Sequence, residues 1–225
     1  MRTFLRDNAL SLVFLGIFLA TLVAQAFVGH ADNNEELRRH DQAVISLGEF
    51  VTSSAFVVDV AENWQSEFLQ FFVFILATVW LVQRGSPESK QPGDEGRGDD
   101  EDQLVGAYAR PDSPRWARAS GWRRSLYGNS LLIWMGAIFV LSWFAQSLAG
   151  LVVANDEAAQ HGEAAETWLG YVASPEFWNR TLQNWQSEFL AVGCMVAFSI
   201  YLRQRGSAES KPVGLPHAET AVESD

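Results

Sequence analysis

A heptapeptide, NWQSEFL, occurs twice in this chain, at residues 63–69 and again at residues 184–190. The two copies are 121 residues apart, and the same offset, applied without a gap, aligns residues 2–90 with residues 123–211. A repeat of this kind has to be identified before any local pattern, because it states that one structural unit is used twice. We therefore predict two related units, residues 1–90 and 123–211.

Apolar residues are gathered in four blocks, two in each copy. The first block of each copy carries no charge and reaches the length of about 20 residues that is needed to cross a bilayer. The second block reaches that length only when it begins at the tryptophan of NWQSEFL, which places one glutamate in the span. We expect transmembrane helices at about residues 9–28, 64–83, 131–153 and 185–204.

The distribution of basic residues predicts the topology. All but three of the sixteen lysines and arginines lie before the first span, between the second and third, or at or beyond the C-terminal end of the fourth. The positive-inside rule then places both termini and the middle segment in the cytoplasm. Because each copy holds two spans, the second copy enters the membrane in the same direction as the first, which defines a parallel repeat. The expected fold class is an all-α membrane protein with four transmembrane helices, arranged as two tandem helical hairpins.

The first apolar block has an alternative interpretation. Arg2 and Arg6, followed by an apolar run and the sequence Ala24-Gln25-Ala26, also fit a cleaved secretory signal. The corresponding block of the second copy is internal and longer, and this favours a retained helix.

The second helix of each copy has recognisable ends. Ser53 and Ser174 are expected N-caps, and Gly85 and Gly206 are expected just beyond the C-termini. A helix over residues 54–84 is about 46 Å long. This exceeds the hydrocarbon core of about 30 Å, so the N-terminal turns are expected to project from the outer surface.

The remaining segments are polar. Residues 91–122 are rich in glycine, proline and acidic residues and are expected to be a flexible acidic cytoplasmic linker, and residues 212–225 a cytoplasmic tail. Near the end of the linker, four arginines alternate with two tryptophans: Arg115, Trp116, Arg118, Trp122, Arg123 and Arg124. This composition favours an interfacial anchor before the third span over a nucleic-acid patch.

Polar residues on the second helices form the candidate site. Glu67 and Glu188 are expected about one turn inside the outer aromatic belt, where a charge costs less than at the bilayer centre. Helical spacing and the repeat place six further side chains near them: Asn63, Ser66, Asn184, Ser187, Gln25 and Gln146. Two carboxylates held together are able to share a proton or hold a cation. The alternative, which we favour, is a structural network that locks the helices together.

Two further polar pairs are related by the repeat. Arg180 corresponds to Asp59, and the two either pair outside the membrane or are unrelated exposed groups, the interpretation that we favour. His40 and His161 each follow acidic residues, but their spacing fits no closed metal-ligand motif, so we expect each to end a helix.

A second motif, QRGS(P/A)ESK, follows both second helices, at residues 83–90 and 204–211. Helix capping and topology explain its arginine and glycine, but not the repeated ESK. We expect an ordered cytoplasmic contact with lipid head groups or a partner, made by Arg84, Lys90, Arg205 and Lys211.

No catalytic arrangement is present. The chain has no GxSxG, phosphate loop, HExxH or cysteine motif, and it contains four histidines and one cysteine. We expect no enzymatic activity, no cofactor, no metal and no nucleic-acid partner.

The combination of NWxSEFL, QRGSxESK and the N-terminal RxFLRDN resembles an uncharacterised family of small bacterial membrane proteins known as a domain of unknown function. The resemblance covers nearly the whole chain and implies a multi-pass location in the bacterial cell membrane. The expected role is structural or interaction-based in the cell envelope, with the lipid bilayer, a second copy or another membrane protein as partners. The competing expectation is a proton or cation permease that uses Glu67 and Glu188.

Overall fold

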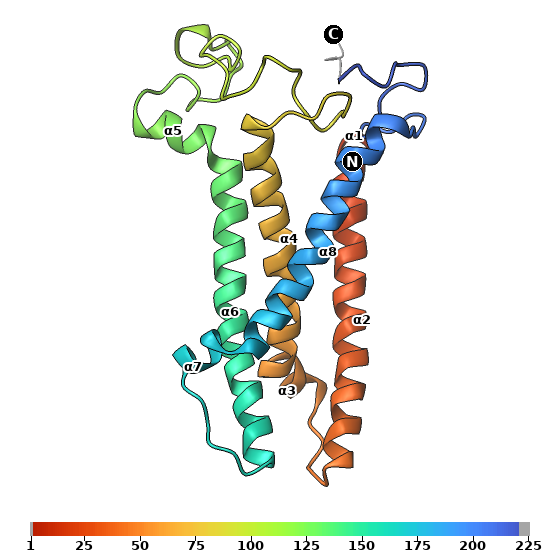
Figure 1. Ribbon diagram of the computed structural model, residues 1–225, viewed down its shortest axis with the longest axis vertical. Coiled ribbons are helices and arrows are strands. Elements are labelled where there is room, and N and C mark those ends of the chain that lie inside the picture. Colours follow the sequence, from red (N-terminus) through yellow and green to blue (C-terminus); the bar gives the residue numbers. More distant parts are fainter. Residues whose placement is uncertain (1, 221–225) are drawn as a thin grey trace. The chain divides into compact units, whose positions relative to one another are not determined.

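The computed structural model describes residues 2–220, so residues 221–225 of the predicted tail lie outside the described part. All regular structure in residues 2–220 is helical, as predicted (Figure 1). The elements, in chain order, are α1 (Arg2–Asp7), α2 (Ala9–Arg39), α3 (Leu47–Val51), α4 (Ser54–Trp80), the 3₁₀ helix η1 (Gly106–Tyr108), α5 (Trp122–Gly128), α6 (Ser130–Gln160), α7 (Trp168–Ala173) and α8 (Pro175–Tyr201).

The element bounds recur at the offset of the sequence repeat. α2 and α6 both contain 31 residues, and α4 and α8 both contain 27, each pair beginning and ending 121 positions apart. The breaks before α2 and α6 also have the same cause. Asn8 Nδ2 donates to Phe4 O at 2.9 Å and Asn129 Nδ2 donates to Ser125 O at 2.7 Å, so each asparagine bonds back to the preceding short helix.

Two helices in the described part of the chain, α2 and α6, are long and apolar enough to cross a membrane. The most apolar 18-residue stretch is 0% buried in α2 and 28% buried in α6, whereas the core helix of a water-soluble protein would be mostly buried. Both helices continue beyond the predicted spans, α2 to Arg39 and α6 to Gln160, so their last turns carry polar residues.

The second helices begin where predicted but end earlier. Ser53 Oγ and Ser174 Oγ each accept a backbone N–H three residues later at 3.3 Å, which confirms both N-caps. α4 ends at Trp80 and α8 at Tyr201, four residues before the predicted ends. The prediction was wrong because Gly85 and Gly206, which do adopt positive φ of 87° and 83°, belong to a separate turn and not to the helix C-terminus.

Among the described residues, the short helices α1, α3, η1, α5 and α7 were not predicted. α3 begins with a capping box, in which Ser46 Oγ accepts from Glu49 N while the Glu49 side chain accepts from Ser46 N. α7 begins in a similar way, with Thr167 Oγ1 accepting from Gly170 N at 3.2 Å. Helices of five and six residues are too short to show a hydrophobic period, so only the caps could have indicated them.

The chain divides into two compact units, of which unit 1 comprises residues 1–61 and 145–172. In it, an asparagine near the end of each long helix holds the following loop. Asn34 exchanges hydrogen bonds with both backbone groups of Ile45, and Asn155 does the same with Glu166. α7 packs on α6 so closely that a Cβ at Gly150 would lie 2.3 Å from the Tyr171 hydroxyl.

Unit 2 comprises residues 62–144 and 173–225 and contains most of α4, the first half of α6 and all of α8. α4 approaches α6 at Gly136, where a Cβ would lie 2.9 Å from the Phe72 ring. Such close approach is typical of small residues at contacts between membrane helices. The contact between α4 and α8 in this unit holds most of the candidate site.

Candidate polar site between α4 and α8

The polar contact between α4 and α8 is centred on Glu62. Its carboxylate accepts a hydrogen bond from Arg180 Nε at 3.1 Å on one oxygen and from Asn184 Nδ2 at 2.8 Å on the other. The side chains of Glu62 and Arg180 are only 16% and 32% exposed. The ion pair is therefore partly buried, and the prediction that Arg180 is an exposed group was wrong.

A second polar contact lies one turn further along α4. Trp185 Nε1 donates to Gln65 Oε1 at 2.7 Å, and Gln65 is completely buried. Its other polar atom, Nε2, has no hydrogen-bond partner among the described residues. Position 65 faces α8 while Gln186, its counterpart in the second copy, is exposed. The two NWQSEFL copies therefore have the same sequence but different surroundings.

An aromatic cluster on α6 and α8 adjoins these bonds. Trp143 of α6 has ring centroids of Phe177, Trp178 and Trp185 of α8 within 5.8–6.0 Å. Trp143 Nε1 also donates to Thr181 Oγ1, at 3.4 Å. The rings contact one another in edge-on, tilted and stacked arrangements, so they fill this part of the unit and hold α8 against α6.

The predicted site residues of unit 2 have different environments. Ser66 is buried and Ser187 exposed, yet each donates to the carbonyl three residues earlier in its own helix. Asn63 is exposed, whereas Asn184 is half-buried and bonds to Glu62. Glu67 is exposed and Glu188 half-buried. The charge of Glu67 acts on Glu188, and among the described residues neither forms an ion pair.

The two remaining predicted members belong to unit 1. Gln25 is half-buried on α2, and Gln146 is buried on α6 with no hydrogen-bond partner for its Oε1 among the described residues. An unpaired buried amide oxygen is costly and marks Gln146 as a position that needs a donor.

Sequence reasoning missed Glu62, Gln65 and Trp185 as network members, although the repeat carried a usable signal. The observed bonds join residues 118, 120 and 122 positions apart, close to the repeat offset. Nearly equivalent positions of α4 and α8 thus face each other, and the α4 polar residues at spacing three, Glu62 and Gln65, could have been found by testing offsets near 121.

The QRGS(P/A)ESK motif folds in the same way in both copies. Ser89 Oγ accepts from Gln83 N at 2.8 Å and Ser210 Oγ accepts from Gln204 N at 2.9 Å, which closes a turn after each helix. Ser86 of the first turn is completely buried and lies 3.2 Å from Ser199 of α8, oxygen to oxygen. The repeated serine is therefore explained by the turn itself.

The motif lysines point into the protein. Lys211 is 3% exposed, and its Nζ donates to the carbonyl oxygens of Glu219 at 2.8 Å, His217 at 3.1 Å and Pro216 at 3.4 Å. Burial, together with the nearby Arg203, lowers the pKa of Lys211, and Glu219 partly opposes this shift. Lys90 likewise donates to Gly96 O. The expectation that Lys211 contacts lipid or a partner was wrong, because its own tail encloses the ammonium group.

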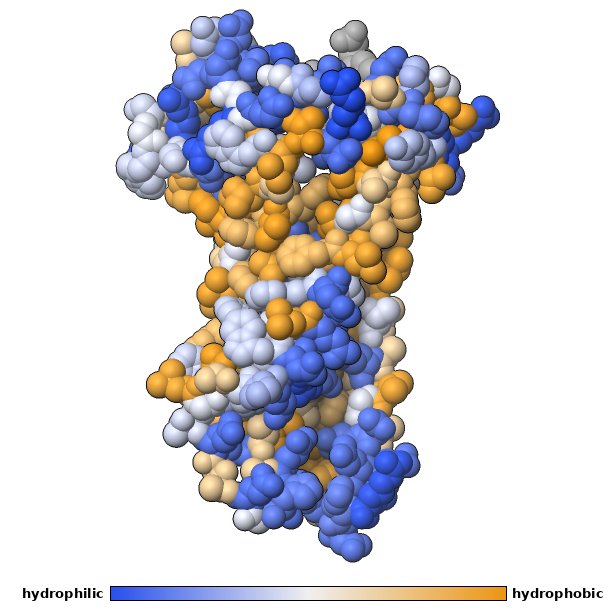
Figure 2. Space-filling view, in the orientation of Figure 1, coloured by the Kyte–Doolittle hydropathy of each residue, from blue (hydrophilic) through white to orange (hydrophobic). Residues whose placement is uncertain are grey.

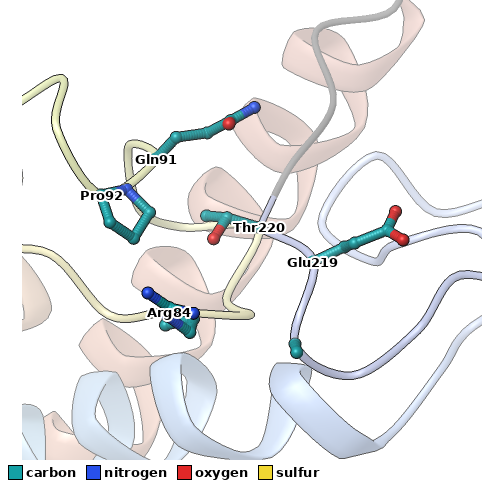
Figure 3. Close-up of a pocket in the computed structure, with 6 residues that line it drawn as sticks. Arg84, Gln91, Pro92, Glu219 and Thr220 are labelled. Carbon is teal, nitrogen blue, oxygen red and sulfur yellow. The ribbon is translucent and has the colours of Figure 1, made fainter.

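The arginines of the motif remain outside. Arg84 and Arg205 are exposed. Figure 3 shows Arg84 beside a shallow pocket with Gln91, Pro92 and Thr220, while the Glu219 side chain points away from it. The tail reaches this place because Thr220 Oγ1 accepts from Gly85 N at 3.1 Å.

The glutamates of the two motifs interact. Burial is the main cause that raises the pKa of Glu88, and the charge of Glu209, with a hydrogen bond between the two side chains, adds to it. The repeat thus brings two equivalent carboxyl groups together outside the predicted spans.

The two histidines of the repeat lie at helix ends. His40 is the C-cap of α2, and His161 directly follows α6, as predicted. Among residues 2–220 there is no group of three or more His, Cys, Asp or Glu side chains that could hold a metal ion.

These observations define an all-helical protein with two helices able to cross a membrane and a polar, aromatic contact between α4 and α8. The model of one family, described as Domain of unknown function (DUF6766), matches residues 1–222. The chain therefore belongs to that family. Comparisons with curated proteins and with solved structures found no match.

Proposed function

We propose that this is a multi-pass protein of the bacterial cell membrane with four spans in two tandem hairpins, and that its role is structural or interaction-based and not enzymatic. α4 and α8 supply the two spans that hydropathy alone does not identify. Each has 27 residues, about 40 Å at 1.5 Å per residue, which exceeds a hydrocarbon core of about 30 Å.

The surface of α8 supports this assignment. Figure 2 shows hydrophilic side chains over its N-terminal half and hydrophobic ones over its C-terminal half. The C-terminal half leaves large apolar side chains exposed at 40–68% of their area, a surface that lipid covers favourably: Phe189, Leu190, Met195, Phe198 and Tyr201. The polar half then corresponds to the projecting outer turns.

The single observation that carries the structural role is the pairing around Glu62. Both carboxylate oxygens are bonded to α8, and the adjoining Gln65 is bonded to α8 as well. Polar groups that are paired across helices stabilise a membrane protein and fix its register. A passage for ions needs polar groups that remain accessible to the ion. The two carboxylate oxygens of Glu62 and Oε1 of Gln65 already accept hydrogen bonds from α8.

The second candidate function is a proton or cation permease, and one observation favours it. Glu67 and Glu188 are equivalent positions of α4 and α8, whose nearly equivalent positions face each other, and neither forms an ion pair among the described residues. Like charges in proximity favour uptake of a proton or a cation by one of them.

Reconstitution in liposomes separates the two. Wild type, the double variant Glu67→Gln/Glu188→Gln and the variant Glu62→Gln are compared for proton and cation flux and for folded yield. The structural role predicts no flux above that of protein-free liposomes, and a folded yield that falls in Glu62→Gln.

A permease function predicts the opposite pattern of ion flux and folded yield. Wild-type flux would be abolished in Glu67→Gln/Glu188→Gln with the folded yield unchanged, and that result would overturn the proposed role. Glu176→Gln, an exposed glutamate in the first turn of α8, is the matched control for loss of one carboxylate.

A further inference from the structure

The arginine and tryptophan residues before α6 form a surface that the α4–α8 network does not explain. We propose that this surface, Arg115, Trp116, Trp122, Arg123 and Tyr127, binds the anionic phospholipid head groups of the cytoplasmic leaflet. The inference rests on the proposed membrane location, and it names the class of lipid that this surface binds.

The structure divides the four arginines into two pairs. Arg124 Nη1 bonds to Asp100 at 2.9 Å, and Arg118 Nη2 donates to the carbonyl oxygens of Arg110, at 2.6 Å, and Pro111. Arg124 therefore holds the linker against α5, and Arg118 holds the linker to itself. Arg115 and Arg123 are exposed and form no ion pair among the described residues.

The aromatic side chains give the free arginines a platform. Trp116 packs edge-on against Trp122 and Tyr127, with ring centroids 6.5 and 6.4 Å apart. The three rings nevertheless remain 42–68% exposed, and the Arg123 guanidinium lies 5.5 Å from the centre of the Trp122 ring. Exposed aromatic rings beside arginine are suited to the head-group layer, where ring faces meet apolar chains and guanidinium groups meet phosphates.

The position of this surface in the chain, directly before α6, places it at the level of the lipid head groups. Only Asn129 separates α5 from α6, and large apolar side chains, Leu131, Ile133 and Trp134, are exposed from the first turn of α6. The hydrocarbon layer therefore begins directly after α5, and the rings of the surface lie beside it.

Charge complementarity selects the head group. The chain has a formal net charge of −11, yet no acidic residue occurs between Asp112 and Asp156. Zwitterionic lipid offers no net attraction to this local positive charge, whereas anionic lipid is attracted by about 1 kcal/mol for each arginine near the surface. The corresponding helix of the first copy, α1, contains an acidic residue, Asp7, which pairs with Arg6, and no tryptophan.

The test uses the full-length protein in phosphatidylcholine nanodiscs that contain an equal mole fraction of brominated phosphatidylglycerol or brominated phosphatidylcholine. The bromine atoms quench nearby tryptophan, and subtraction of the Trp122→Phe protein isolates the emission of Trp122. We expect brominated phosphatidylglycerol to quench this emission at least about twofold more strongly than brominated phosphatidylcholine.

The stronger quenching of Trp122 by brominated phosphatidylglycerol should be lost in Arg115→Gln/Arg123→Gln. It should persist in Arg115→Lys/Arg123→Lys, which keeps both charges, and in the control Arg6→Gln. Equal quenching of wild-type Trp122 by the two lipids would overturn lipid selection while leaving the membrane location intact. Absence of quenching of every tryptophan by both lipids would overturn the membrane location itself, and this inference with it.

Discussion

Glu62 is the residue on which the contact between α4 and α8 depends most. A carboxylate that is mostly covered is stabilised only while donors reach it, and removal of one donor exposes the cost of its burial. Arg180 supplies the charged donor and Asn184 the neutral one. Arg180 should therefore contribute more to the free energy of unfolding than an arginine in an exposed ion pair does.

We expect Arg180→Gln to lower the free energy of unfolding by about 1–3 kcal/mol, because Glu62 keeps a charge with one fewer donor. The measurement is a denaturant titration in detergent micelles. Arg39→Gln is the matched control, since Arg39 pairs with Glu35 while both side chains are at least 60% exposed. The expected decrease in the free energy of unfolding for Arg39→Gln is below about 1 kcal/mol. If the two variants cost the same, the Glu62 network does not hold the helices.

Glu88 supplies a prediction on pH. Its folded-state pKa is raised, first by burial and then by Glu209, so folding favours the protonated carboxyl. The stabilisation is fully present below the unfolded pKa, about 4.3, and is lost as the pH rises through the raised folded pKa. Glu88→Gln removes this titration. The melting temperature of the variant relative to wild type should therefore increase across that window, and a constant difference would contradict the assignment.

The sequence indicated Asn184 as a member of the network but missed Glu62, Gln65 and Trp185. The repeat correctly suggested that similar positions of α4 and α8 face each other, and it identified Asn184 as a member of the site. The repeat related Arg180 to Asp59, and we favoured the interpretation that both are exposed, whereas Arg180 bonds in unit 2 to Glu62, three positions after Asp59 in the sequence. A shift of three residues along a helix changes the partner without changing the face, so the repeat offset of 121 alone does not identify the partner.

At the scale of elements, strong local signals gave correct boundaries. Serine caps indicated the starts of α4 and α8, and uninterrupted apolar runs indicated the starts, but not the ends, of α2 and α6. The C-terminal ends were misplaced because a positive-φ glycine has the same sequence signature in a helix stop and in a separate turn. The serines that close that turn, Ser89 and Ser210, lie further along the motif.

The N-cap of α8 is open to a direct test. Ser174→Ala should lower the free energy of unfolding by about 0.5–2 kcal/mol, because the N–H of Phe177 loses its acceptor at the start of a 27-residue helix. Ser187→Ala on the same helix is the control, since the exposed Ser187 only donates to a carbonyl of its own helix. Equal effects of the two substitutions would show that the cap contributes nothing.

At the scale of the whole molecule, the proposed topology accounts for both the sequence repeat and the distribution of basic residues. If each copy crosses the membrane twice, the linker and both termini share one side, and the loops after α2 and α6 share the other. A tail that caps the first QRGSPESK turn requires that both motifs lie on the same side, and Thr220 does accept a hydrogen bond from Gly85. An inverted repeat would separate the two motifs by the thickness of the membrane.

Cysteine accessibility tests this arrangement. Cys194 is the only cysteine, so Cys194→Ala gives a background into which Glu101→Cys in the linker, Ala218→Cys in the tail or His161→Cys after α6 is introduced. An impermeant maleimide should label His161→Cys in intact cells, and the other two only after permeabilisation, because the bilayer separates them from the outer solution. Labelling of Glu101→Cys and Ala218→Cys from opposite sides would require an odd number of spans between them, which two tandem hairpins do not allow.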